Sequence, residues 1–353
     1  MKIFFIGETS HSNAQSWLKG IKEYSDFEIE TWKIEHKKGA FGNILRTWTW
    51  LYSCFFLKRR IHKSKADLLI CERVTSYGFL GACTGFHPMV VSQQGITDVW
   101  PPNSISTPFK AILARWALKK ADMIHAWGEV MIPALLELGA NPAKIKVLPR
   151  GVDLNRFNFK AEGKHLDKIK AIVTRSLTSD YNHDVIIKAA KTLKDNNIPL
   201  EIKIVGDGIL MNKLKMLAKE LDVEDIVSFT GRIQNDQLPF YLAEANMYIS
   251  VPISEGVSAS LFEAMGGGAF PIVTDLPGTR PWIRHGENGF LIPVNDSKAL
   301  AESIITAWNN KTLMQNAILA NRSFVEEKAD YNKNMTQFVA WYKELIKNKL
   351  KAK

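Results

Sequence analysis

The stretch SEGVSASLFEAMGGGAFPIVTDLPGTRPWI, residues 254–283, carries the most information about the fold of this chain. It follows an apolar run, YISVPIS, and predicts a strand that ends near Glu255 and then a helix that carries Glu263 in its first turns. Either Ser258 or Ser260 can cap that helix. This arrangement directs two carboxylates and several free backbone N–H groups to one point above a sheet. Such a point suits a ligand that has both hydroxyls and a phosphate.

The composition is that of a globular protein with two ordinary domains. The chain has 353 residues, 46% of them hydrophobic and 23% charged. Its three cysteines, at positions 54, 71 and 83, form neither a paired framework nor a metal-binding spacing, which favours a reducing compartment. The opening run MKIFFIGETS is too short for a signal peptide, and no apolar run approaches the about 20 residues of a transmembrane helix. We therefore expect a cytoplasmic protein.

The net charge of +10 is concentrated in the first part of the sequence. Residues 1–150 hold 20 lysines and arginines against 12 acidic residues. Such an excess favours an anionic partner: nucleic acid, acidic lipid or a phosphorylated substrate. A generally lysine-rich composition is the alternative. Because the basic residues follow no aromatic-platform pattern of a nucleic-acid-binding module, we expect no nucleic-acid partner.

Short apolar runs alternate with amphipathic segments along the whole chain, as in KIFFIG, ADLLIC, PMVVSQ, KAIVT, EIKIVG and FPIVTD. This alternation predicts parallel strands with crossover helices, hence an α/β fold with two Rossmann-like domains facing across a cleft. The polar stretch 148–168 is the expected linker. We expect a first domain over 1–155, a second over 156–330, and a helix with a basic tail over 331–353 that returns to the first domain.

Two further signals follow strands of the second domain, where open α/β sheets bind ligands. Arg175 comes after KAIVT, and a guanidinium there can hold a diphosphate by paired hydrogen bonds; a salt bridge between the domains is the alternative. In KIVGDG, Gly206 allows a ligand to approach the backbone, or it simply forms a tight turn. The GxGxxG fingerprint does not follow the first strand, which disfavours a nicotinamide-dependent dehydrogenase.

The order of motifs TRSL, IVGDG, FTGRI, SEGVSASLFEAMGGG and GENGFLIPVND resembles the retaining, nucleotide-sugar-dependent glycosyltransferases of family 4, which have the GT-B fold and an E-x7-E motif. PRGVDLNRF is similar to the linker of that family, and TSYGFLGACTGFHPMVVS is similar to members that assemble bacterial surface polysaccharides, including lipopolysaccharide. The resemblance implies a hexosyltransferase that needs no cofactor. Its donor would be a UDP-, GDP- or dTDP-linked sugar, and its acceptor a lipid-linked glycan or an oligosaccharide.

The resemblance also implies roles for single residues. Glu263 would bind the ribose hydroxyls of the nucleotide, and Glu255 would face the sugar ring and the charge that develops at its anomeric carbon. Arg175 would stabilise the departing diphosphate. Backbone N–H groups at the start of the helix would contact the donor and its phosphates, those of Gly256, Val257 and Ser258.

The chain departs from the family pattern in the loop after Arg175. Family members usually carry a lysine there, whereas residues 180–182 read Asp-Tyr-Asn. The second phosphate cation is then either missing or supplied from elsewhere, and Arg232 of TGRI is the candidate to supply it. Because no D-x-D sequence stands at a strand end, we expect metal-independent chemistry.

Candidate acceptor residues follow strands of the first domain. Asp98 in QQGITDVW and His125 in MIHAWGE stand where either could contact or deprotonate an acceptor hydroxyl. A structural role is the alternative for a lone histidine after a strand. Glu72 stands where related enzymes often show a histidine, and we rank it below the other two.

Residues 41–65, FGNILRTWTWLYSCFFLKRRIHKSK, combine aromatic and basic side chains. This mixture is typical of a helix that lies on an anionic membrane surface. The alternative is a core helix that ends in a solvated basic turn. We expect peripheral membrane contact, which suits an enzyme with a lipid-linked acceptor.

Two other functions stay open at this stage. A GT-B-fold epimerase would act on a nucleotide sugar without any acceptor. A catalytically silent, glycosyltransferase-like scaffold would be consistent with the missing lysine.

Overall fold

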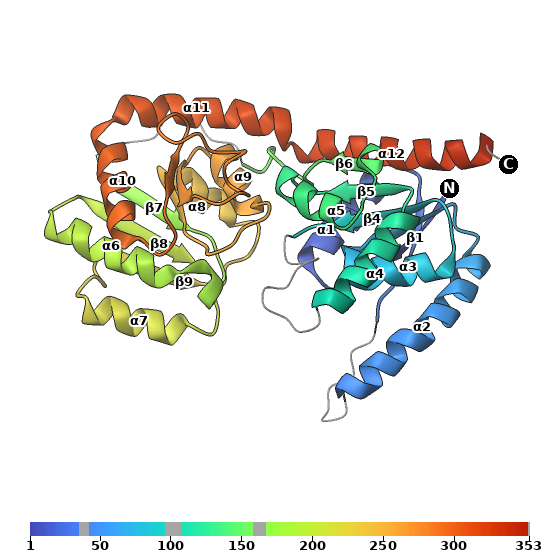
Figure 1. The fold of residues 1–353 in the computed structure, drawn as a ribbon. Coiled ribbons are helices and arrows are strands. Elements are labelled where there is room, and N and C mark those ends of the chain that lie inside the picture. Colours follow the sequence, from blue (N-terminus) through green and yellow to red (C-terminus); the bar gives the residue numbers. More distant parts are fainter. Residues whose placement is uncertain (35–41, 96–106, 158–166, 352–353) are drawn as a thin grey trace. The chain divides into compact units, whose positions relative to one another are not determined.

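The computed structural model describes residues 1–34, 42–95, 107–157 and 167–351. The chain divides into two compact units (Figure 1). Unit 1 comprises Met1–Arg150 and Asn332–Lys353, and unit 2 comprises Gly151–Tyr331. Each unit holds a parallel six-stranded sheet. The predicted α/β class with two Rossmann-like domains is therefore confirmed.

The sheet of unit 1 has the strand order β2-β1-β3-β4-β5-β6. Strands β1, β3, β4 and β5 are almost entirely buried, as expected for parallel strands covered by helices on both faces. The six strands are β1 (Lys2–Ile6), β2 (Glu28–Trp32), β3 (Leu68–Glu72), β4 (Met89–Gln93), β5 (Met123–Ala126) and β6 (Ile145–Val147).

The helices of unit 1 connect these strands and cover the sheet. They are α1 (Ser12–Glu23), α2 (Gly42–Ser64), α3 (Phe79–Thr84), α4 (Thr107–Lys120), α5 (Ile132–Glu137) and α12 (Tyr331–Lys351), with a π-helical turn at Arg73–Gly78. The last helix packs here although it is far along the sequence. The ring centres of Phe338 in α12 and of His125 lie 4.3 Å apart. The side-chain amide of Asn334, also in α12, donates to the carbonyl oxygen of Pro149 at 2.9 Å.

The sheet of unit 2 has the order β12-β11-β10-β7-β8-β9. Its strands are β7 (Ile169–Val173), β8 (Leu200–Val205), β9 (Val227–Gly231), β10 (Met247–Ser250), β11 (Phe270–Thr274) and β12 (Phe290–Ile292). Its longer helices are α6 (His183–Asp195), α7 (Met211–Glu220), α8 (Leu238–Glu244), α9 (Ala259–Gly266), α10 (Ser297–Asn309) and α11 (Lys311–Lys328).

Alternate residues of β7 belong to two different cores. Ala171 and Val173 belong to a core with α6, α7, α10 and the first half of α11, whereas Ile172 belongs to a core with α8, α9 and the last turns of α11. Successive side chains of a strand point to opposite faces, so this strand anchors both helical layers. Packing on both faces fixes the carboxyl end of β7, and the candidate site lies just beyond this end of the strand.

Within the described residues, every helix is too short or too polar to cross a membrane.

Candidate functional site

The candidate site of unit 2 lies where the direction of the sheet reverses. The chain runs from β7 outward through β8 and β9 and then returns to the other side of β7 with β10. In an open α/β sheet, ligands bind beyond the carboxyl ends of the strands at such a switch point. Arg175 follows β7 by two residues and Glu255 follows β10 by five, so the fold places both side chains at this point.

Arg175 is held by three polar side chains of its own unit. Its Nη2 forms an ion pair with Glu255 and donates to the Ser258 hydroxyl, and its Nε donates to the hydroxyl of Ser250 at 3.2 Å. The guanidinium also lies over the ring of Tyr181, at 5.1 Å from its centre. The Arg175 and Glu255 side chains are each 12% exposed, so the ion pair can still be reached from solvent.

The surroundings of Arg175 favour its charged form. Burial opposes the charge, but the attraction of Tyr248, Glu255 and Tyr181 outweighs this effect and raises the pKa of Arg175. The pKa of neighbouring His183 is lowered to about 4, first by burial and then by the charge of Arg175. The site therefore presents a permanent cation beside a neutral imidazole at neutral pH.

Helix α9 begins beside this cation. Of the two caps that the sequence allows, Ser258 is the one that forms, because its hydroxyl accepts from the N–H of Leu261 at 3.2 Å. Ser260 instead accepts from the hydroxyl of Tyr248 at 2.9 Å. Glu255 lies in the loop before the helix and Glu263 within it, as the sequence predicts. The backbone of Gly256 and Val257 belongs to the same loop.

Glycines let two other loops pack against the site. A Cβ atom on Gly206 would lie 2.2 Å from the carbonyl oxygen of Arg175, so a side chain there would displace the Arg175 backbone. A Cβ atom on Gly278 would lie 2.2 Å from the carbonyl oxygen of Glu255. Gly206 thus supports the site rather than standing open beside it. The sequence interpretation missed Gly278, although the glycine was visible in LPGTR.

Arg232 is not joined to the Arg175 cluster by any interaction between described residues. It is exposed and follows β9, which is separated from β7 by β8. Among the side chains that the structure describes, no group of three or more His, Cys, Asp or Glu has the geometry of a metal site.

The predicted acceptor residues of unit 1 have different outcomes. Asp98 lies outside the described residues. His125 is fully buried, its Nε2 is 2.9 Å from the carbonyl of Leu148, and aromatic rings of Trp17, Phe338 and Trp341 surround it. Burial lowers the pKa of His125 to about 4. An acceptor hydroxyl cannot reach a ring enclosed in this way, so the geometry favours the structural alternative.

Carboxylates that the sequence interpretation ranked low or missed meet at the switch point of unit 1, between β1 and β3. Glu72 is 1% exposed and accepts from the N–H of Glu8. The Glu8 carboxylate accepts from the hydroxyl of Tyr77 at 2.6 Å, and burial together with this bond raises the pKa of Tyr77. Gly7 permits the contact, because a Cβ there would lie 2.6 Å from Glu72 Oε2.

The fold defines the class of the protein. Over 96% of this chain and 98% of the other, the structure matches Anabaena Alr3699/HepE, solved in complex with UDP, with a TM-score of 0.77 and 18% sequence identity. This likeness identifies the GT-B fold.

Two family models match the chain, one in each part of the sequence. Residues 155–324 match the family model of Glycosyl transferases group 1, and residues 23–156 match that of Glycosyltransferase Family 4. Both matched models describe glycosyltransferases, in agreement with the resemblance seen in the motifs.

Several curated relatives are glycosyltransferases by name. The amylovoran biosynthesis glycosyltransferase AmsK of Erwinia amylovora is 26% identical over 59% of this chain and 54% of its own length. The UDP-Gal:alpha-D-GlcNAc-diphosphoundecaprenol alpha-1,3-galactosyltransferase of Escherichia coli is 30% identical over 50% of this chain and 48% of its own length. The chain thus spans about half the length of these relatives.

Proposed function

We propose that this chain is a retaining glycosyltransferase that transfers a sugar from a nucleoside diphosphate sugar to a lipid-linked glycan in surface-polysaccharide synthesis. One observation carries the proposal: the guanidinium of Arg175 lies at the switch point of unit 2, next to the capped N-terminus of α9. A fixed cation and free backbone N–H groups together suit a diphosphate leaving group.

The donor would be held by unit 2 through separate contacts to its parts. Arg175 and the backbone of Gly256 and Val257 would bind the diphosphate. Glu255 would face the sugar, and Glu263 would bind the ribose. The complex of Alr3699/HepE with UDP supports UDP as the first nucleotide to test. Arg232 would contribute only if its long side chain turns from β9 toward the phosphates.

The chemistry requires stabilisation of negative charge on the departing phosphate. Glycosyl transfer passes through an oxocarbenium-like state while charge builds on the leaving group, and Arg175 is the permanent cation at this point. For retention, we propose that a donor phosphate oxygen accepts the proton of the acceptor hydroxyl on the same face of the sugar. We propose that neither a metal nor another cofactor takes part.

The acceptor would bind unit 1. The Escherichia coli relative acts, by its name, on a sugar linked to diphosphoundecaprenol, and its similarity to this chain supports a lipid-linked acceptor here. Asp98 remains a proposed acceptor contact. The buried position of His125 supports a structural role for that residue instead.

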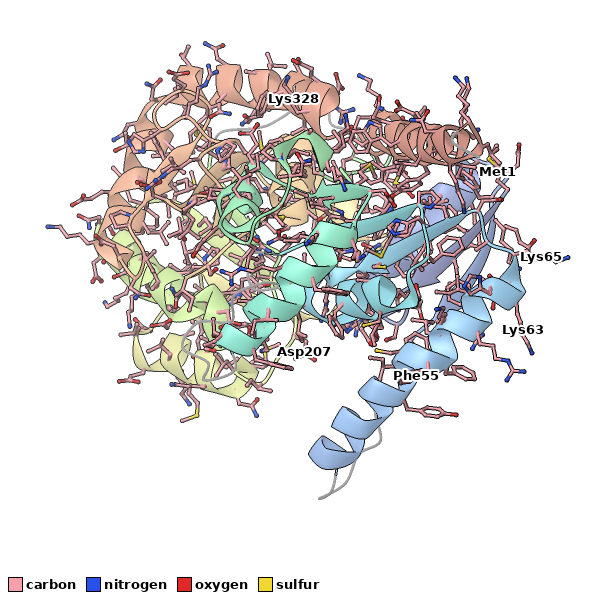
Figure 2. All side chains as sticks on the ribbon, turned by 45° about the vertical axis from the view of Figure 1, so that its right-hand side comes forward. Met1, Phe55, Lys63, Lys65, Asp207 and Lys328 are labelled. Carbon is pink, nitrogen blue, oxygen red and sulfur yellow. The ribbon has the colours of Figure 1, made fainter. Side chains whose placement is uncertain are left out.

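We also propose that α2 binds the cytoplasmic membrane surface. Ser53, Leu57 and Ile61 face the core of unit 1, whereas the opposite face exposes Tyr52 by 70% and Phe55 by 83%. Basic side chains follow on the same helix and just after it, with Lys63 and Lys65 exposed (Figure 2). Exposed aromatic rings beside cations match the headgroup region of an anionic bilayer.

A thermal-shift screen against UDP, GDP and dTDP, with and without their common sugars, tests the donor site. A ligand that binds only the folded chain raises its melting temperature. The anomeric configuration of a transferred sugar, read by proton NMR, then tests retention. An inverted product would contradict the retaining mechanism, and epimerised donor in the absence of acceptor would point to an epimerase.

A further inference from the structure

The cation assigned to the diphosphate already has an anionic partner within its own unit. Arg175 Nη2 bonds to both the Glu255 carboxylate and the Ser258 hydroxyl, while Nε bonds to Ser250. Within the described part of the chain, Nη1 has no hydrogen-bond partner. Two of the three nitrogens are therefore occupied, and one of the occupying groups carries a negative charge.

A carboxylate and a phosphate compete for the same guanidinium. Both are oxyanions that accept two parallel N–H bonds from an arginine. If Glu255 keeps its place, an incoming diphosphate binds Nη1 alone and lies close to a like charge. If Glu255 leaves, its carboxylate needs another hydrogen-bond donor, because a partly buried charge without a partner is unfavourable.

The sugar of the donor can supply that second partner. Sugar hydroxyls donate hydrogen bonds to carboxylates. When a nucleotide sugar binds, these hydroxyls can therefore replace Arg175 as the hydrogen-bond donors to Glu255. A nucleoside diphosphate without sugar offers no such compensation. Ser250 and Ser258 are neutral and hold the guanidinium in place in both cases.

We propose that Glu255 is a specificity-determining residue, which makes the site favour nucleotide sugars over the sugar-free nucleoside diphosphate by competing for Arg175. The inference rests on the proposed function, since it assumes a diphosphate at Arg175 and a sugar at Glu255. Its consequence is selective weakening of the product complex, in which the sugar has left and the carboxylate returns to the guanidinium.

The test compares binding of UDP and UDP-glucose, by isothermal titration calorimetry, to wild-type protein and to Glu255→Gln. If the thermal-shift screen selects GDP or dTDP, that nucleotide and its sugar form replace them. We expect wild-type protein to bind the sugar form about tenfold more tightly, a difference of about 1.4 kcal/mol. In Glu255→Gln, the sugar-free nucleotide should bind about tenfold more tightly than it does to wild type, and the preference for the sugar form should fall to about twofold or less.

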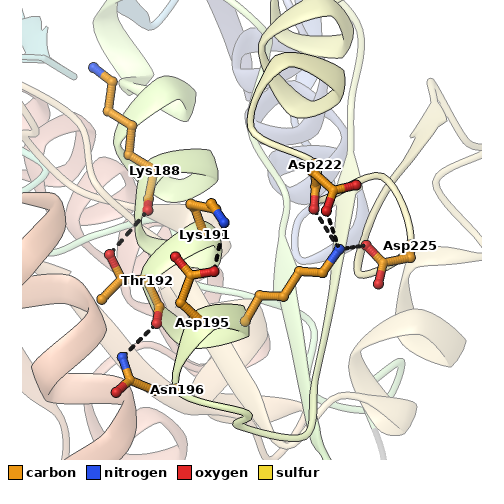
Figure 3. A network of polar contacts seen from close by, with 8 residues as sticks. Lys188, Lys191, Thr192, Asp195, Asn196, Asp222 and Asp225 are labelled. Carbon is orange, nitrogen blue, oxygen red and sulfur yellow. Dashed lines mark hydrogen bonds and ion pairs between the residues drawn. The ribbon is translucent and has the colours of Figure 1, made fainter.

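Asp225→Asn serves as a matched control, because it also removes one carboxylate that is paired with a cation. Asp225 pairs with Lys194 at 2.8 Å, and Asp222 lies at the same lysine (Figure 3). Asp222 and Asp225 precede the amino end of β9, whereas Arg175 follows the carboxyl end of β7, so this network lies at the other end of the strands from the site. The control should bind both ligands as wild type does.

The possible failures are distinguishable. If none of the nucleotides binds wild-type protein, the proposed function fails and this inference fails with it. If nucleotides bind but Glu255→Gln leaves the ratio of the two affinities unchanged, or weakens both ligands equally, the inference alone is overturned. A change of ratio in Asp225→Asn as large as in Glu255→Gln would show that net charge, rather than competition at Arg175, sets the preference.

Discussion

Ser258 has two roles: it caps helix α9, and it holds Arg175, the candidate phosphate-binding cation, in position. A substitution at Ser258 should therefore affect both stability and binding. Its hydroxyl accepts from the N–H of Leu261, which caps α9, and from Arg175. Loss of an N-cap costs about 1 kcal/mol, and loss of a hydrogen bond to a charged group costs about as much again or more. Ser258→Ala should therefore destabilise unit 2 by about 2 kcal/mol. For a domain of this size, that lowers the melting temperature by about 4–8 °C.

Measurements of nucleotide affinity separate the loss of the helix cap from the loss of the hydrogen bond to Arg175. Ser258→Ala should weaken nucleotide binding, because Arg175 loses one of the groups that fix it, whereas Ser258→Thr should largely restore both stability and binding. Asp296→Ala is the control: the Asp296 side chain caps α10 by accepting from Ala299 at 2.8 Å and has no part in the site. It should lower the melting temperature but leave UDP affinity unchanged. Equal loss of affinity in both cap variants would refute the positioning role of Ser258.

Three further changes test other parts of the account. The pKa of His125 is about 4 in the folded chain against an ordinary 6.5, so its contribution to stability is complete above pH 6.5 and declines by about 3 kcal/mol as pH falls to 4. His125→Phe should reduce the loss of urea-unfolding stability over this range by about that amount, while His183 still contributes its own pH dependence. Parallel pH curves of wild type and variant would contradict this reasoning. Gly278→Ala should push the Glu255 loop aside and weaken UDP-glucose binding at least about tenfold; unchanged affinity would count against this loop contact. Tyr52→Ser with Phe55→Ser should abolish sedimentation with phosphatidylglycerol vesicles, whereas Phe240→Ser, at an exposed phenylalanine of unit 2, should not; equal loss in both would mean that α2 is not the membrane surface.

Much of unit 2 could be predicted from sequence because the informative signals are local. The run 254–283 contains its own strand end, cap and helix, and buried strands alternate visibly with amphipathic helices. The partner of Arg175 could not be predicted in this way, because Glu255 is 80 residues away and the contact depends on β10 returning beside β7. Side-chain geometry was also needed to decide which of Ser258 and Ser260 caps α9.

Unit 1 was less predictable, because its important contacts join residues that are far apart in the sequence. Strand β5, which contains His125, is recognisable in the sequence, but the burial of the His125 ring depends on α12, which comes more than 200 residues later. Glu8 and Glu72 meet only because β1 and β3 are neighbours, whereas sequence order would pair β1 with β2 alone. Tyr77 reaches Glu8 from the π-helical turn at Arg73–Gly78, which leaves no simple periodicity.

The central claim is that Arg175 binds the diphosphate of a nucleotide donor. Removal of the guanidinium alone would leave Glu255 without its cation, so the decisive comparison is between Glu255→Gln and the double variant Arg175→Gln with Glu255→Gln. Calorimetric titration with UDP, or with the nucleotide that the screen selects, should show at least about thirtyfold weaker binding to the double variant, a loss of about 2 kcal/mol. Equal affinity of the two variants, with both still folded, would contradict the account.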